Sequence, residues 1–177
     1  LELPIVENPC PEDRGSKRYE IKQLIGNLGP HEFGFEKIAY LLLFGDLPTP
    51  EQQAEFTDIL SSCRTLPTNF TRDVIMKAPS KDIMNSMTRS VLTLASYDDR
   101  VNGDLANSIR QCVRLISEFP MLAVYGYHAY NHYENDDSMY IHRPDPNLPT
   151  AENILRMLRH DMQYTELEAK ALDIALI

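Results

Sequence analysis

Residues 104–133 read DLANSIRQCVRLISEFPMLAVYGYHAYNHY, and this stretch decides the fold. Fully helical, it would be about 45 Å long, at about 1.5 Å of rise per residue. Its first half spaces apolar residues three and four positions apart, which predicts one apolar stripe: Leu105, Ile109, Cys112, Val113 and Ile116. Around Pro120, apolar side chains cover several faces, which indicates burial in a core or a subunit interface. Pro120 cannot donate a backbone hydrogen bond and its ring crowds the preceding turn, so we expect a kink there.

The rest of the sequence keeps a helical period in segments that Pro and Gly separate, with no sustained two-residue alternation. A Thr-x-x-Gln capping box, with Pro in its second position, opens the segment near residue 50. At other boundaries Gly45 ends a helix, Ser80 and Asp104 are predicted to cap one, and two further helices open at Thr150 and Thr165. Besides 104–133, the predicted helices are residues 17–27, 35–44, 50–63, 68–77, 80–96, 150–159 and 165–177. The sequence therefore predicts an all-α, multi-helical bundle of eight or nine helices.

Length, composition and net charge limit the classes of protein and partner that fit this sequence. The chain has 177 residues, of which 43% are hydrophobic and 24% charged, enough for one domain with a core. The formal net charge of −9 argues against a nucleic-acid or anionic-membrane surface, because both need a basic patch. No apolar run approaches the roughly 20 residues of a membrane-spanning helix, and we find no secretory signal.

Three cysteines, Cys10, Cys63 and Cys112, stand far apart without a Cys-x-x-Cys pair. Their odd number indicates reduced thiols and a cytoplasmic protein. Cys112 lies on the apolar stripe and is predicted to be a small core residue. As a nucleophile it has no basic partner at a recognisable spacing, so the catalytic interpretation is disfavoured.

Both ends of the chain are atypical. Residues 1–16 are rich in Pro and charge and show no periodicity, which predicts an irregular segment. The chain begins at Leu1 and ends in ALDIALI, an apolar pattern that no Gly, Asn or Pro stops. We therefore expect residues 17–177 to be a helical fragment of a longer protein, truncated at its C-terminus.

Side chains near the end of the long helix are candidate metal ligands. His128 and His132 lie four positions apart on one helix face, with Glu134 and His142 nearby in sequence. The His-Glu-x-x-His pattern is absent, and a cation at His132 also suits the C-terminal end of a helix. We therefore expect these residues to be structural and predict no metal.

Two charged groups could bind ions. Glu134, Asp136 and Asp137 form an acidic loop, but the central Gly and terminal Glu of a calcium loop are missing, which favours a solvated loop. Three basic residues on one helix could hold a carboxylate or phosphate, although two of them also suit the negative end of that helix: Arg156, Arg159 and His160. We find no Gly-rich phosphate loop and no Gly-x-Ser-x-Gly motif, so the residues alone predict an all-α domain without an assigned activity.

Several stretches together resemble the N-terminal part of the citrate synthase family, which includes 2-methylcitrate synthases. Five segments match in order, covering about residues 17 to 177: residues 35–49 (FEKIAYLLLFGDLPT), 84–98 (MNSMTRSVLTLASYD), 114–130 (RLISEFPMLAVYGYHAY), 144–158 (PDPNLPTAENILRML) and 171–177 (ALDIALI). The resemblance implies the N-terminal part of that family's large helical domain.

The resemblance also implies an activity, the condensation of acetyl-CoA with oxaloacetate to citrate and CoA, in the tricarboxylic acid cycle. In the family a carboxylate removes a proton from the acetyl methyl, and histidines stabilise the enol and polarise the keto acid. The family's first active-site histidine follows the stretch that matches ALDIALI, so we expect every catalytic residue beyond Ile177. We assign no catalytic, cofactor-binding or metal residue within this chain, and acetyl-CoA is a substrate, not a cofactor.

A homodimer is the partner that the resemblance implies, because the family's matching helices pack against their symmetry mates. We expect the interface around four residues of the central helix: Met121, Leu122, Val124 and Tyr125. Two alternatives stay open. The parent could be a 2-methylcitrate synthase, which takes propionyl-CoA, or the chain could be a non-catalytic helical module for dimerisation or interaction.

Overall fold

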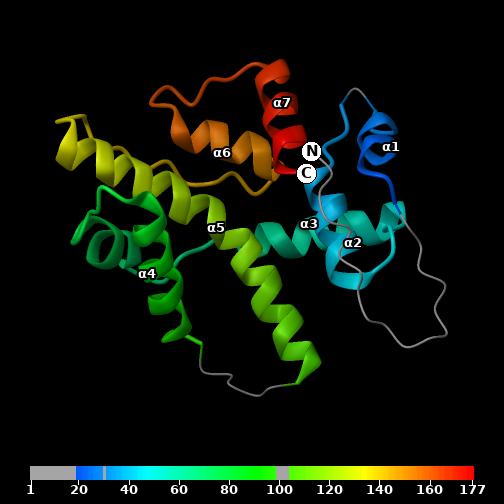
Figure 1. Cartoon of the computed structure of the whole chain (residues 1–177), viewed down its shortest axis with the longest axis horizontal. Coiled ribbons are helices and arrows are strands. Elements are labelled where there is room, and N and C mark those ends of the chain that lie inside the picture. The colour runs from blue at the N-terminus through cyan, green and yellow to red at the C-terminus, as the bar shows by residue number, and fades with distance from the viewer. Residues whose placement is uncertain (1–18, 30, 99–103) are drawn as a thin grey trace.

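Helix α5 (Leu105–Glu134) is thirty residues long and runs diagonally across the molecule (Figure 1). The Asp104 side chain caps it by accepting a hydrogen bond of 2.7 Å from the backbone N–H of Asn107. Pro120 lies inside the helix, and the helix axis changes direction near its middle in Figure 1, as expected. The computed structural model describes residues 19–29, 31–98 and 104–177, so the predicted irregular segment 1–16 and Cys10 lie outside the described residues.

Within these described residues, seven shorter helices accompany α5. They are α1 (Ile21–Gly26), α2 (Phe35–Phe44), α3 (Pro50–Ser62), η1 (Thr71–Met76), α4 (Ile83–Ala95), α6 (Thr150–Leu158) and α7 (Glu166–Leu176). Every regular element in the described ranges is a helix, which confirms the all-α prediction. Within the same ranges, no helix has both the length and the apolar character that a membrane crossing requires.

Local capping signals are confirmed at several helix ends. Thr49 and Gln52 exchange hydrogen bonds in a capping box at the start of α3. Gly45 ends α2 with a φ of 84°, a left-handed conformation that glycine adopts without strain. A second capping box opens α7, where Thr165 pairs with Glu168.

Two predicted boundaries are wrong. Ser80 does not cap α4, because its hydroxyl accepts from the N–H of Asp82, and Asp82 itself caps the helix through Asn85. The segment predicted as a helix over 68–77 is a six-residue π-helix that starts only at Thr71. Asn69, with a φ of 63°, is in a left-handed conformation, so a right-handed helix cannot run through it.

The core lies along α5 in two clusters. Around its C-terminal half, α5 packs against η1, α4 and α6 through these buried residues: Phe70, Ile75, Leu94, Met121, Leu122, Val124, Tyr125, Ala129 and Met157. Around its N-terminal half it meets α2 and α3 through a smaller set: Ala39, Phe56, Leu60 and Val113. The bent helix therefore contributes residues to two hydrophobic clusters, one on each side of its middle.

These cores correct two predictions about α5. The four residues expected at a dimer interface, Met121, Leu122, Val124 and Tyr125, are all buried inside this chain's own core, so their side chains cannot form its surface. Cys112 was predicted in the core but is exposed, because α3 packs on the neighbouring face through Val113. The apolar surface of α5 extends beyond the face that the neighbouring helices of this chain cover.

Candidate functional site

The histidines near the end of α5 bind backbone carbonyls. His128 is buried, and its Nε2 lies 3.1 Å from the carbonyl oxygen of Met157 at the end of α6. Its ring packs on Tyr140, with 4.4 Å between centroids, and burial lowers the pKa of His128. His132 Nδ1 lies 2.7 Å from the carbonyl oxygen of Asp137. Across residues 19–29, 31–98 and 104–177, no group of three His, Cys, Asp or Glu side chains could hold a metal ion.

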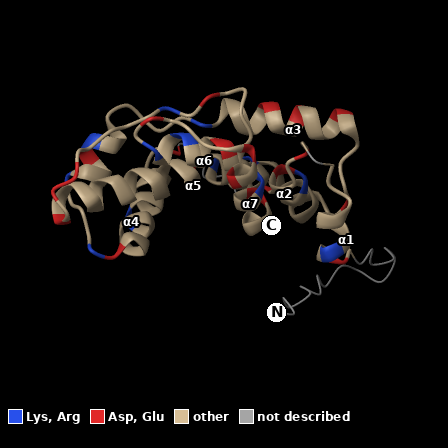
Figure 2. Cartoon of the chain, turned by 90° about the horizontal axis from the view of Figure 1, so that it is seen from above, with Lys and Arg blue, Asp and Glu red and all other residues tan. Residues whose placement is uncertain are grey.

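The acidic loop after α5 is exposed, as predicted for a solvated segment. Glu134 pairs with Lys81 at 3.1 Å, which ties the end of α5 to the segment before α4. Asp136 takes a left-handed conformation with a φ of 56°. Figure 2 shows further acidic residues as red bands along α3. These carboxylates face solvent or single cations, which accounts for their positions without a bound ion.

The basic residues of α6 are held by acceptors within the chain. Arg156 donates to the backbone carbonyl of Arg143 at 2.6 Å. Arg159 donates through both terminal nitrogens to Glu168, at 2.5 and 3.2 Å. Hydrogen bonds from Arg159, and then from Thr165, lower the pKa of Glu168 to about 2. Arg156 and Arg159 therefore connect α6 to its flanking loop and to α7.

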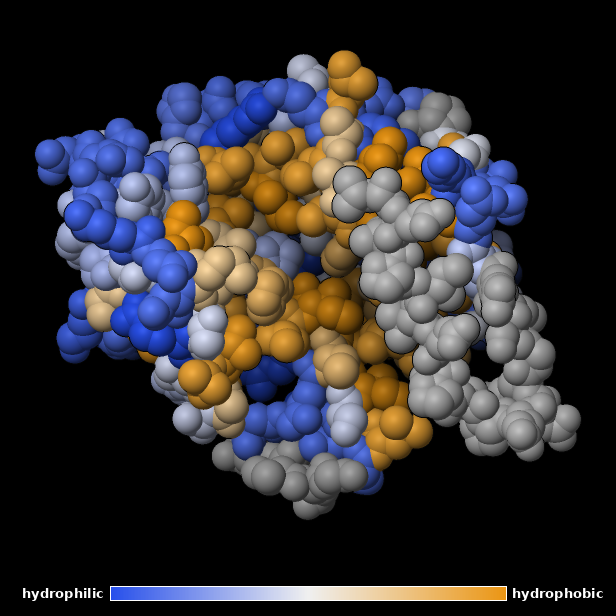
Figure 3. Space-filling view, in the orientation of Figure 1, coloured by the Kyte–Doolittle hydropathy of each residue, from blue (hydrophilic) through white to orange (hydrophobic). Residues whose placement is uncertain are grey.

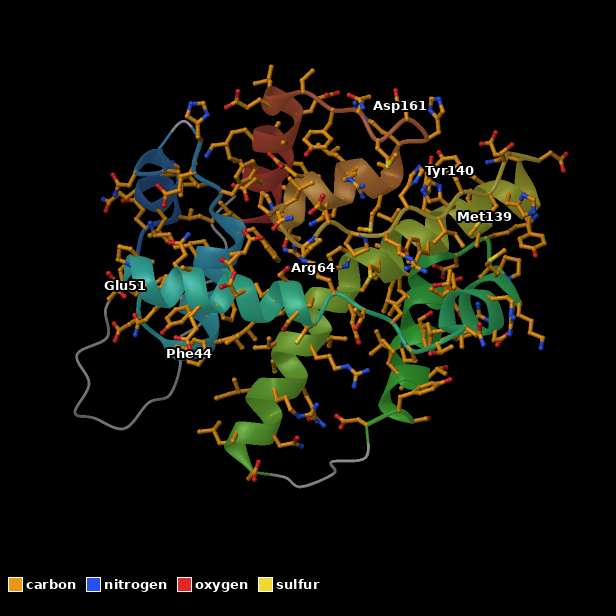
Figure 4. All side chains as sticks on the ribbon, turned by 180° about the vertical axis from the view of Figure 1, so that it is seen from behind. Phe44, Glu51, Arg64, Met139, Tyr140 and Asp161 are labelled. Atoms are coloured by element: carbon orange, nitrogen blue, oxygen red, sulfur yellow. The ribbon has the colours of Figure 1, made fainter. Side chains whose placement is uncertain are left out.

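A buried polar network joins α2, α6 and the residues that follow α3, and the sequence patterns do not reveal it. The Glu36 carboxylate, 3% exposed, accepts a hydrogen bond of 2.7 Å from the N–H of Thr150, the first residue of α6. Arg64 lies 3.7 Å from the same carboxylate and is 8% exposed. Burial lowers the pKa of Arg64, and the nearby Glu36 opposes that change. Figure 4 shows Arg64 in the middle of the molecule, where α3 ends beside α5.

Arg64 and Asn153 complete the network around the start of α6. Arg64 donates to the Leu148 carbonyl at 2.5 Å and to the Thr150 hydroxyl at 3.2 Å. Asn153 is buried, accepts from the Asp145 N–H at 2.7 Å and donates to the carbonyls of Asp145 and Leu148. The network thus satisfies its own buried polar groups and fixes the loop that leads into α6.

A second buried carboxylate connects α7 to α2. Asp173 is fully buried, and its two oxygens accept from the N–H groups of Gly34 and Phe35 at 2.7 and 3.0 Å. These N–H groups form the N-terminal end of α2, where a negative charge is favoured. Asp173 stands four residues after the buried Ala169, on the apolar face of its helix. A polar residue on such a face is the sequence signal that could have revealed it.

An apolar surface remains uncovered on α4 and α5. Figure 3 shows a broad hydrophobic area in the middle of the face seen in Figure 1. The exposed large apolar residues of these two helices include Met84, Leu92, Leu115, Phe119 and Tyr127. An uncovered apolar area of this kind marks an interaction site more often than a chance feature.

The helical arrangement has counterparts among known proteins. Residues 16–177 match the family model described as citrate synthase, C-terminal domain. The chain is 32% identical over 149 residues to a citrate synthase of Corynebacterium glutamicum, covering 81% of this chain and 33% of that protein. It is 27% identical over 160 residues to a 2-methylcitrate synthase of Shewanella oneidensis, covering 90% and 39%. The chain thus spans between a third and two-fifths of the length of these relatives.

Solved structures share the fold. The citrate synthase of Pyrobaculum aerophilum matches with a TM-score of 0.72 and 19% identity, covering 89% of this chain and 39% of that one. The citrate synthase of Thermoplasma acidophilum, solved with carboxymethyl coenzyme A and oxaloacetate, matches with a TM-score of 0.75 and 19% identity, covering 89% and 38%. Taken with the match of the family model over nearly the whole length, these helices identify the chain as a member of the citrate synthase family.

Proposed function

We propose that this chain is the N-terminal helical part of a citrate synthase that condenses acetyl-CoA with oxaloacetate. The carbon–carbon bond forms between the acetyl methyl and the keto carbon, and water then releases citrate and free CoA. The match of residues 16–177 to the family model is the observation that supports this proposal. That model is described as the C-terminal domain, so the position of the chain within the parent is itself part of the proposal and depends on the five ordered segments of the sequence.

The catalytic residues of the parent lie beyond Ile177 in this proposal, and the isolated chain is inactive. The histidines at 128, 132 and 142 all bind backbone carbonyls, which gives each a structural role. The parent needs no cofactor, since acetyl-CoA and oxaloacetate are substrates. We place it in the cytoplasm on the basis of three cysteines without a Cys-x-x-Cys pair.

Release of the CoA thiol from acetyl-CoA plus oxaloacetate tests this function. The intact parent and the 177-residue chain are assayed side by side. Activity in the parent and none in the chain is the expected result. Activity in the isolated chain would overturn the placement of the catalytic residues. An inactive parent, with either acyl-CoA, would leave a helical scaffold with a non-catalytic role.

A 2-methylcitrate synthase is the second candidate, because the Shewanella oneidensis relative carries that name. It predicts a higher kcat/KM with propionyl-CoA than with acetyl-CoA. The same thiol assay, run on the parent with both substrates, separates the two reactions.

We further propose that the protein forms a homodimer through the uncovered apolar side of α4 and α5. The residues that support this are Leu92 and Phe119, which are 68% and 41% exposed. Leu92→Asp or Phe119→Asp should dissociate the dimer without changing the monomer's fold, as followed by light scattering and circular dichroism. Leu167→Asp is the matched control, since Leu167 is 79% exposed on α7. A Phe119→Asp protein that remains dimeric would place the interface elsewhere.

A further inference from the structure

The C-terminal end of α7 is attached to the segment that leads into α2. Lys170, Asp173 and Ile177 follow one another at spacings of three and four, so they share a face of the helix. Lys170 donates through Nζ to the backbone carbonyls of Gly29 and Glu32. Asp173, one turn later, holds two successive N–H groups at the start of α2. A charged contact and a buried carboxylate therefore attach the same face of α7 to one short segment.

The third contact depends on the absence of a side chain at Gly34. A Cβ atom there would lie 2.6 Å from Cδ1 of Ile177 and 2.6 Å from Cδ1 of Leu28, closer than such atoms approach in proteins. Glycine thus lets Ile177 sit directly against the N-terminal end of α2. The Ile177 side chain also lines a cavity of about 100 Å³ together with Leu24 and Ile38.

We propose that Asp173 is a positioning residue that fixes where, and in which direction, the polypeptide continues past Ile177. This inference rests on the proposed function, because the catalytic groups of the parent would lie in that continuation. A carboxylate that accepts hydrogen bonds from two backbone N–H groups at the end of another helix keeps its own helix from sliding along, or rotating against, that helix. A displacement of about 1 Å in catalytic groups can cost roughly a hundredfold in rate.

The test compares Asp173→Asn with Glu36→Gln in the intact parent. Both substitutions remove a buried carboxylate that accepts from the N-terminal end of a helix, but only Asp173 lies on α7 and attaches it to α2. Asp173→Asn should lower kcat roughly 10- to 100-fold, with a smaller change in KM for acetyl-CoA. Glu36→Gln should keep kcat within about twofold of the wild type while losing a similar or larger part of its thermal stability.

Hydrogen exchange gives a second readout that does not need activity. Asp173→Asn should speed amide exchange in the last turn of α7 and in the residues after Ile177, whereas Glu36→Gln should leave exchange in α7 unchanged. If Asp173→Asn does not fold, Gly34→Ala replaces it, because the added methyl clashes with Ile177 and Leu28 at the contact between α7 and α2 and leaves every charge in place.

The outcomes are distinct. A kcat that falls in both variants in proportion to lost stability, or that stays at the wild-type level in Asp173→Asn, would overturn the inference. An inactive wild-type parent would remove the proposed function instead, and the exchange pattern would still decide whether Asp173 controls the exit of the chain. Exchange that rises equally in α6 and α7 in both variants would show a general loosening and would contradict the inference.

Discussion

Replacing Glu36 by Gln should destabilise the fold mainly by isolating the charge of Arg64. The amide oxygen of the new side chain can still accept from the Thr150 N–H, so the hydrogen bond at the start of α6 survives. Arg64, 8% exposed, loses the only carboxylate that the structure places beside it at 3.7 Å within the described residues. Breaking a buried ion pair costs about 3–5 kcal/mol. Because Arg64 keeps two hydrogen bonds, we expect about 3 kcal/mol.

For a domain of this length, such a loss corresponds to a fall in Tm of roughly 6–12 °C. Thermal and urea unfolding followed by circular dichroism would measure it, with the exposed Glu55→Gln as a control that changes stability by less than about 0.5 kcal/mol. In a double-mutant cycle, Glu36→Gln combined with Arg64→Met should cost less than the two single changes added together. A loss below about 1 kcal/mol for Glu36→Gln, or strict additivity in the cycle, would refute the reasoning.

Three further predictions concern α5 and α2. Burial lowers the pKa of His128, so the unfolded chain binds a proton at this histidine more readily than the folded chain does. The free energy of unfolding should therefore fall as the pH drops below about 6.5. In urea unfolding, His128→Gln should make the free energy of unfolding less dependent on pH between pH 7 and 5.5. Leu122→Ala removes a core side chain that is 1% exposed and should cost about 3–4 kcal/mol in urea unfolding without changing the oligomeric state seen by light scattering. Gly45→Ala places a methyl group in open space but at a φ of 84°, so unfolding should show a loss of about 1 kcal/mol from backbone strain alone.

The helices that the sequence predicts well are those whose ends carry a capping residue. Asp104, Gly45 and the Thr49 capping box each act within three or four residues, so a single stretch of sequence contains the whole signal. The prediction that Ser80 caps α4 is wrong because two residues able to cap stand two positions apart, and the Asp82 carboxylate is the one that accepts from the N–H of Asn85.

The exposed surface of α5 and the partners of the buried carboxylates could not be predicted in this way. A helix that is apolar on several faces does not reveal which of them its own chain covers, and so Leu122 was expected at an interface and Cys112 in a core. Glu36 and Asp173 bind groups that are 114 and 139 residues away. Such pairings depend on the arrangement of whole helices, which local spacing does not contain.

The distance in sequence between α2 and its buried carboxylate also sets an order of events during synthesis. Translation at roughly 5–20 residues per second needs about 7–28 s to cover the 139 residues between Gly34 and Asp173. During that time the N–H groups at the start of α2 lack their native acceptor, and α6 has not yet met Glu36. Helix α2 therefore waits on the ribosome until α6 and α7 have been synthesised, and only then can it bind Thr150 and Asp173.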